Sequence, residues 1–183
     1  MSASAAPDRR VIPISQADPA AVAAFFATVP EGDGTFFKED VLDRNAIAEW
    51  VRSERGQRWV ATDGNGVVGY VAVVPLTGWS SHVGEVRLVV SAAARGAGVG
   101  RTLARKSLLG ALQLGLTKII VEVVADQAPA IGMFQALGFA PEAMLHDHVR
   151  DRSGTLRDLV VLAHSVEDTW SGFATAGVDP EVS

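Results

Sequence analysis

The chain has 183 residues, of which 48% are hydrophobic, a formal net charge of -5 at pH 7 and no cysteine. This length and composition allow one domain with one hydrophobic core. The negative charge argues against nucleic acid and anionic membrane surfaces as partners, because these are bound mainly through excess lysine and arginine. The absence of cysteine excludes disulfides, a thiol nucleophile and cysteine metal sites.

The sequence contains no apolar run of membrane-spanning length, and residues 1–10 lack the apolar core of a signal peptide. We therefore expect a cytoplasmic protein that does not enter a membrane, as a monomer or a homodimer. The domain is expected over residues 9–166, after a flexible N-terminus (1–8) and before a loosely ordered tail (167–183).

The N-terminal part predicts one strand and two helices. Residues 9–15 form the strand, and Asp18 followed by Pro19 is a typical N-cap and first position of a helix that reaches about Thr28. A second helix is predicted over about 39–55. Its apolar side would consist of Val41, Leu42, Ile47 and Trp50.

The loop between these helices is both acidic and aromatic. It carries Glu31, Asp33, Phe36 and Phe37. A hinge with two phenylalanines in the core and a substrate-binding loop are both consistent with this composition.

Strands and helices alternate over the rest of the chain. Strands 58–63 and 67–75 flank the turn Gly64-Asn65-Gly66, which is a strong hairpin signal. A strand over 82–90 precedes a glycine-rich turn. The remaining elements are a helix over 98–114, a buried strand over 118–124, a helix over 129–137 and a hairpin of strands 139–150 and 155–164. This order predicts an α/β domain with a mixed central sheet and helices on both faces.

The glycine-rich turn has the features of an anion site. Glycine permits positive φ, and a helix start offers unpaired N–H groups and the positive end of the helix dipole. Arg95, Arg101 and Arg105 surround this helix start, where cations are disfavoured unless an anion compensates them. An ordinary turn with solvated arginines is the alternative.

Two known phosphate loops do not fit these residues. A P-loop needs Lys after the last glycine, but Arg101 follows Gly100. A dinucleotide fingerprint needs a small residue where Leu103 stands and an acid at the end of the next strand, whereas Glu122 lies within that strand.

The pattern Arg-x-x-Gly-x-Gly at Arg95, Gly98 and Gly100 resembles the pyrophosphate loop of the GNAT superfamily of acyl-CoA-dependent N-acyltransferases. Gln127, Ala130, Phe134 and Gly138-Phe139 follow at the spacing of that family's Asn, Ala, Tyr and Gly-Phe segment. The predicted element order is also that of the GNAT fold, so the resemblance covers nearly the whole domain.

The resemblance implies acetyl-CoA as cosubstrate and no metal. It implies that the strands before and after the glycine-loop helix splay apart and hold acetyl-CoA between them. The residues expected to bind it are Leu88, Val89, Val90, Arg95, Gly96, Ala97, Gly98, Val99, Gly100, Arg101, Gln127, Ala130 and Phe134.

Acyl transfer to an amine needs a base and a donor to the developing oxyanion. The resemblance points to Glu85 as the base, while its alternation with Arg87 also predicts an ion pair on one strand face. Glu122 is the rival carboxylate. His146 is a further catalytic candidate, because histidine as a residue type titrates near neutrality. His82 and His148 are candidates for the same reason.

Phe134 departs from the family pattern, which commonly has a Tyr there to protonate the coenzyme A thiolate. The only tyrosine is Tyr70, far from Phe134 in sequence. We expect an N-acetyltransferase that moves an acetyl or short acyl group from coenzyme A to an amine by direct nucleophilic attack. Its acceptor is a small-molecule amine, a peptide N-terminus or a lysine. The alternatives are a non-catalytic acyl-CoA-binding or sensing protein, and an unrelated α/β domain that binds no acyl-CoA.

Overall fold

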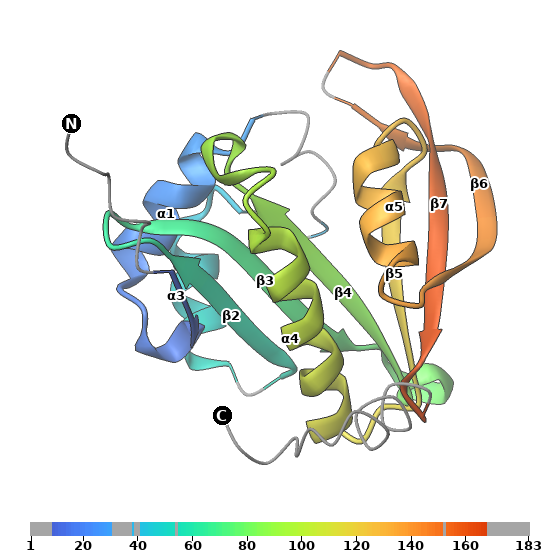
Figure 1. Cartoon of the computed structure of the whole chain (residues 1–183), viewed down its shortest axis with the longest axis horizontal. Coiled ribbons are helices and arrows are strands. Elements are labelled where there is room, and N and C mark those ends of the chain that lie inside the picture. Colours follow the sequence, from blue (N-terminus) through green and yellow to red (C-terminus); the bar gives the residue numbers. More distant parts are fainter. Residues whose placement is uncertain (1–8, 31–37, 39–40, 54, 152, 168–183) are drawn as a thin grey trace, which may run out of the picture.

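The structure, a computed structural model, describes residues 9–30, 38, 41–53, 55–151 and 153–167. Its strands are β1 (Arg10–Pro13), β2 (Gln57–Thr62), β3 (Val67–Pro75), β4 (Val83–Val90), β5 (Lys118–Val124), β6 (Ala140–Arg150) and β7 (Leu156–Ser165). They form one seven-stranded sheet in the order β1-β2-β3-β4-β5-β7-β6 (Figure 1). The predicted mixed α/β sheet is confirmed.

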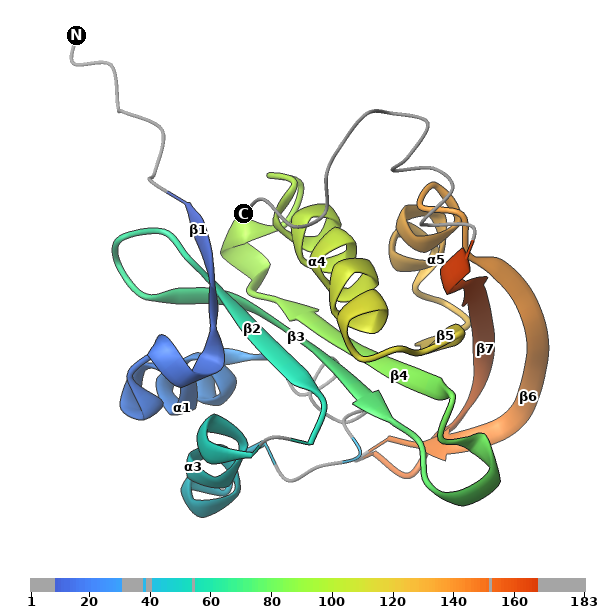
Figure 2. The same cartoon turned by 90° about the horizontal axis from the view of Figure 1, so that it is seen from below.

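Helices cover both faces of this sheet, as predicted. They are α1 (Pro19–Thr28), α3 (Arg44–Arg52), α4 (Val99–Gln113) and α5 (Ala128–Gln135), with short 3-10 turns η1 (Ile14–Gln16), η2 (Gly78–Ser80) and η3 (Ala92–Ala94). Figure 2 shows α1 and α3 on one side of the sheet and α4 and α5 on the other.

The alternation of side chains along the central strands builds a separate core on each face. Val60 and Tyr70 are fully buried with the residues of α1 and α3, whereas Trp59 and Val71 are buried against α4. Successive strand residues point to opposite faces, so strands that are apolar at every position serve both cores.

Gly110 fixes how closely α4 lies on the sheet. A Cβ at this position would lie 2.3 Å from the Cη2 atom of Trp59 on β2, a distance that real side chains do not tolerate. The absence of a side chain therefore lets the helix pack directly over the tryptophan ring. This packing positions the N-terminus of α4, where the glycine-rich turn ends.

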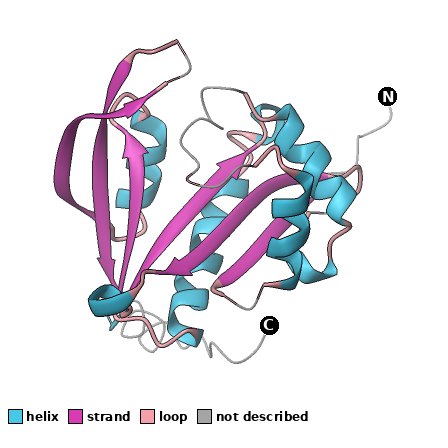
Figure 3. Cartoon of the chain, turned by 180° about the vertical axis from the view of Figure 1, so that it is seen from behind, coloured by secondary structure: helices cyan, strands magenta, loops and turns pink. Residues whose placement is uncertain are grey.

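The β4–β5 pair creates an opening in the sheet. It is parallel, whereas the other strand pairs among the described residues are antiparallel. Its register ends at Val86 opposite Val121, and the two strands then diverge, as the view from behind shows (Figure 3). The expected splay is confirmed.

The second helix is shorter than predicted at both ends. It begins at Arg44 because the Asp43 side chain accepts a hydrogen bond from the backbone N–H of Asn45 at 2.8 Å, which makes Asp43 the N-cap. Leu42 precedes the helix and is 55% exposed, so it is not part of the buried apolar side. The helix ends at Arg52 rather than Arg55.

Several sequence expectations fall outside the described residues. These are the structural states of residues 1–8 and 168–183 and the packing of Phe36 and Phe37 in the loop 31–37. Within the described part of the chain, no helix combines the length and the apolar character needed to cross a membrane.

Candidate active site

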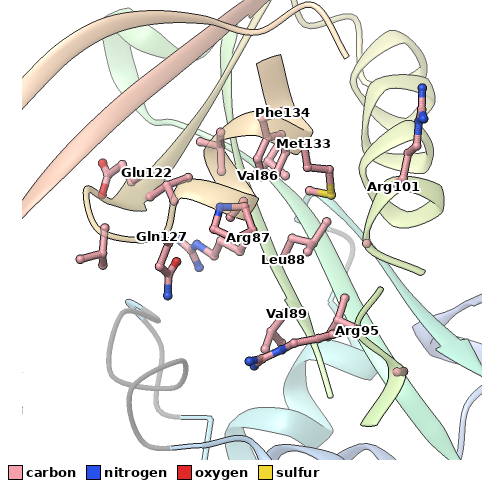
Figure 4. A pocket seen from close by; sticks show the side chains of 18 of the residues that line it. Val86, Arg87, Leu88, Val89, Arg95, Arg101, Glu122, Gln127, Met133 and Phe134 are labelled. Atoms are coloured by element: carbon pink, nitrogen blue, oxygen red, sulfur yellow. The ribbon is translucent and has the colours of Figure 1, made fainter. Parts of the chain in front are cut away.

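A cleft of about 680 Å³ lies where β4 and β5 separate. Beyond Val86, β4 pairs with β3 along one edge, and no strand among the described residues pairs with its other edge. That edge offers backbone N–H and C=O groups to a bound chain. The apolar walls of the cleft come from β4, β5 and α5, and include Val86, Leu88, Val121, Val123, Met133 and Phe134 (Figure 4).

The glycine-rich turn closes one end of this cleft. Gly96 and Gly98 have φ of 72° and 83°, in the left-handed region that glycine adopts without a steric penalty. Gly98 is the N-cap of α4 and provides no side-chain cap, and the first turn of α4 has no acidic residue. The helix start therefore leaves its N–H groups and dipole available to an anion.

Contacts on both sides hold the glycine-rich turn in place. Val99 is buried in the core beneath it, and Arg9 donates a hydrogen bond to the carbonyl of Ala97 at 3.1 Å. Gly100 faces α5, because a Cβ there would lie 3.2 Å from the sulfur of Met133. Arg95 and Arg101 line the cleft and add positive charge to this end.

Helix α5 forms the wall opposite α4. Gln127 is its N-cap but makes no side-chain capping bond, and its side chain lines the cleft together with Ala130 and Phe134. The Phe134 ring packs edge-to-face on Phe139 at a centroid distance of 5.1 Å. Helix α5, with the sequence APAIGMFQ, has no ionisable side chain.

Most residues expected to bind the cosubstrate line this one cleft. Ala97 and Val99 belong to the same turn but do not line it, since Val99 packs into the core and Ala97 offers its carbonyl to Arg9. The lining residues are Leu88, Val89, Val90, Arg95, Gly96, Gly98, Gly100, Arg101, Gln127, Ala130 and Phe134.

Two carboxylates stand where the strands begin to separate. Glu85 on β4 is 5% exposed, and Arg87 on the same strand face places Nε 3.3 Å from its Oε1 atom. The ion pair predicted for these residues is present. Glu122 on β5 is less buried, and both carboxylates line the cleft.

Lys38 joins the two carboxylates. Its Nζ atom lies 3.0 Å from Oε1 of Glu122 and 3.3 Å from Oε1 of Glu85. Burial alone would lower the pKa of Lys38, but the hydrogen bond to Glu122 and the charges of both carboxylates raise the pKa above its ordinary value of 10.5. The lysine is therefore held as a cation.

His146 lies outside the cleft. It is on β6, which β7 separates from β5, and its side chain is 78% exposed. Its Nδ1 atom lies 3.1 Å from Asp158 on β7, next to an irregularity in the β6–β7 register where Asp147 has a φ of 51°. His82 and His148 do not line the cleft either.

Sequence reasoning missed Lys38 and Met133. Lys38 is a single lysine in a loop, and no local pattern relates it to carboxylates on two strands of the sheet. Met133 is adjacent to Phe134 and could have been found by helical spacing from Ala130. Val121 and Val123 share one face of β5 by strand alternation and Glu122 lies on the other, and the cleft between the separated strands is lined by all three.

The arrangement combines an anion site, an apolar channel with free strand edges, and a pair of carboxylates. Along β4, Glu85 and Val90 are separated by about 16 Å of strand, at the usual rise per residue. A long thin ligand with an anionic end would fit between the glycine-rich turn and the carboxylates. Among the described residues, no group of three or more His, Asp or Glu side chains could hold a metal ion.

Comparisons with known proteins find acetyltransferases among the relatives of this chain. N-acetyltransferase 8F1 of Rattus norvegicus is 32% identical over 108 residues, which are 57% of this chain and 48% of the rat protein. The chain therefore matches about half the length of that relative. YwnH of Bacillus subtilis (strain 168) is 27% identical over 152 residues, which are 80% of this chain and 92% of YwnH.

The fold also matches solved structures. The structure of yncA from Salmonella typhimurium with its cofactor acetyl-CoA superposes with a TM-score of 0.74 and 18% identity, covering 86% of this chain and 94% of that one. A model of the acetyltransferase (GNAT) family matches residues 23–139, which include the glycine-rich turn, both carboxylates and α5. This chain therefore belongs to the GNAT family of acetyltransferases.

Proposed function

We propose that the chain transfers an acetyl group from acetyl-CoA to an amine by direct attack of the amine on the thioester. The observation that carries the proposal is the single cleft that has the glycine-rich turn at one end and Glu85 and Glu122 at the other. The acetyl-CoA bound in the yncA structure supports the choice of cosubstrate.

The residues of the cleft fit acetyl-CoA. The N–H groups at the start of α4, with Arg95 and Arg101, would bind the pyrophosphate. The free edge of β4 at Leu88 to Val90 would hydrogen-bond the pantetheine amides in the manner of an added strand. Gln127 has a carboxamide that α5 does not use as a cap, so it can hold the cosubstrate from the opposite wall.

Glu85 is the proposed base. It accepts a proton from the attacking amine directly or through a water molecule, the C–N bond forms, and the C–S bond breaks. Its partners Arg87 and Lys38 hold the carboxylate in place one residue before the strands separate after Val86. Backbone N–H groups of the free β4 edge polarise the thioester carbonyl.

The departing thiolate receives no proton from α5, because Phe134 replaces the usual tyrosine and that helix has no ionisable side chain. Tyr70 cannot take over, since it is fully buried and accepts a hydrogen bond from Arg58 at 2.7 Å. A thiol with a pKa near ~8.5 is a tolerable leaving group without an acid. We propose that solvent supplies the proton.

Thermal unfolding with and without acetyl-CoA tests the cosubstrate. At ~100 times its Kd, a ligand adds about 2.7 kcal/mol, which raises the Tm of a domain of this size by roughly 5 to 11 °C. Adenosine nucleotides and NAD, which lack the pantetheine arm, serve as controls. No rise at saturating acetyl-CoA would overturn both the transferase and the sensor interpretation.

An amine panel tests the reaction. Because the chain has no cysteine, a thiol reagent reports released coenzyme A without any background from the protein. The panel should contain an alkyl diamine, an α-amino acid, a peptide with a free N-terminus and a peptide with a lysine. Binding of acetyl-CoA without coenzyme A release from any class would favour the sensor.

A further inference from the structure

One amine of the protein already lies at the two carboxylates of the cleft. The Nζ atom of Lys38 contacts Glu122 at 3.0 Å and Glu85 at 3.3 Å, and both carboxylates line the cleft in which the thioester is proposed to bind. An acceptor amine would have to reach the same place to pass its proton to Glu85. The Nζ atom of Lys38 therefore lies where a substrate amine would approach Glu85, although it belongs to the chain itself.

The other two lysines have different surroundings. The sequence contains only Lys38, Lys106 and Lys118. Lys106 is on α4 with its Nζ atom 5.8 Å from the centroid of the Trp59 ring, and Lys118 is at the start of β5 and pairs with Glu142 at 2.6 Å. Neither is paired with Glu85 or Glu122, so both provide internal controls.

We propose that Lys38 is an acetylation site of the protein itself, modified from acetyl-CoA bound in its own cleft when no external amine competes. This inference rests on the proposed function. The Lys38 ammonium first gives a proton to Glu85, and its neutral nitrogen then attacks the thioester carbonyl carbon. The new C–N bond forms, the C–S bond breaks, the second nitrogen proton is lost to solvent, solvent protonates the departing thiolate, and Glu85 releases the first proton to solvent.

The modification changes the charge of the site. It removes the positive charge of Lys38, so that Glu122 loses this ion pair and Glu85 keeps the one with Arg87. It can occur only once per chain. It should also be slow at neutral pH and accelerate by about tenfold per pH unit, because the carboxylates hold the lysine as a cation and only the neutral amine reacts.

The test is incubation of the full chain with acetyl-CoA in an amine-free buffer, followed by intact mass measurement and peptide mapping over time. We expect one acetyl group on Lys38, at a rate that saturates with acetyl-CoA and does not depend on protein concentration. Acetylation of Lys106 and Lys118 should be at least about tenfold slower. Lys38→Arg should remain unmodified at this position and keep the rise in Tm with acetyl-CoA, while Lys118→Arg should be acetylated like the wild type.

Other outcomes would overturn the inference in distinguishable ways. Equal modification of all three lysines would indicate uncatalysed solution chemistry, and a rate proportional to protein concentration would indicate transfer between molecules. An unmodified Lys38 in a chain that acetylates amines of the panel would remove this inference and leave the proposed function intact. If acetyl-CoA does not raise the Tm, both the proposed function and the acetylation of Lys38 are contradicted.

Discussion

Glu85 and Glu122 extend from two different strands to a single ammonium group, with their Oε1 atoms 3.3 Å and 3.0 Å from Nζ of Lys38. The two carboxylates therefore share one cation but differ in their other surroundings. Glu85 is 5% exposed and also bound by Arg87, whereas the side chain of Glu122 is 21% exposed. The buried carboxylate of Glu85, one residue before the end of the β4–β5 pairing, is better placed to act as the base.

Glu85→Gln should therefore lower kcat by about 100-fold or more, because a positioned base typically contributes that much. The matched variant Glu122→Gln should lower kcat by less than about tenfold, since its main contact is the exposed Lys38. Both variants should retain the rise in Tm with acetyl-CoA. A larger loss in Glu122→Gln than in Glu85→Gln would assign the base to β5 instead.

Gly98→Ala tests the glycine-rich turn. An alanine at the φ of 83° found at this position costs about 1 to 2 kcal/mol, and its Cβ would project into open space at the N-terminus of α4, where the pyrophosphate is proposed to bind. We expect a lower Tm for the free protein and a much smaller rise in Tm with acetyl-CoA.

Gly64→Ala is the matched control. Gly64 has a φ of 86°, and a Cβ there would meet nothing within 4 Å, so the backbone strain is comparable. It lies in the turn between β2 and β3, away from the cleft. This variant should lose similar stability but respond to acetyl-CoA like the wild type. Equal responses in both variants would contradict a role for Gly98 in binding.

The local signals in the sequence predict much of this site, and the contacts between distant segments are what they miss. The glycines of the turn and the alternation of Glu85 with Arg87 are readable because they depend on near neighbours and on the period of a strand. The contact of Lys38 with Glu122 joins residues far apart in the chain. The early start predicted for α3 has a local cause, because the apolar residues Val41 and Leu42 outweighed the N-cap signal of Asp43.

Phe134→Tyr should raise kcat without changing the rise in Tm with acetyl-CoA. Phe134 lines the cleft, so a hydroxyl on its ring could donate a proton to the departing thiolate. The gain should be below the roughly 100-fold of a positioned acid, because a thiol of pKa about 8.5 already leaves readily. Phe134→Leu, which has no proton to give, should show no gain. An unchanged kcat in Phe134→Tyr would contradict proton donation to the thiolate from this position.

Asp158→Asn should destabilise the β6–β7 hairpin and thereby lower the Tm at neutral pH. The backbone N–H of Asp147 and the ring of His146 bond the Asp158 carboxylate, and these bonds lower its pKa below the ordinary value of 3.8. A lowered pKa in the folded state means that the stabilisation is present above pH 3.8 and is lost as the pH falls through the lower folded value. The Tm difference between wild type and variant, measured from neutral pH downward, should therefore shrink below pH 3.8. The control variant Asp126→Asn, which removes only an exposed ion pair with Arg157, should change the Tm little. If the Tm difference between wild type and Asp158→Asn stays constant into strong acid, the Asp158 carboxylate does not stabilise the hairpin in this way.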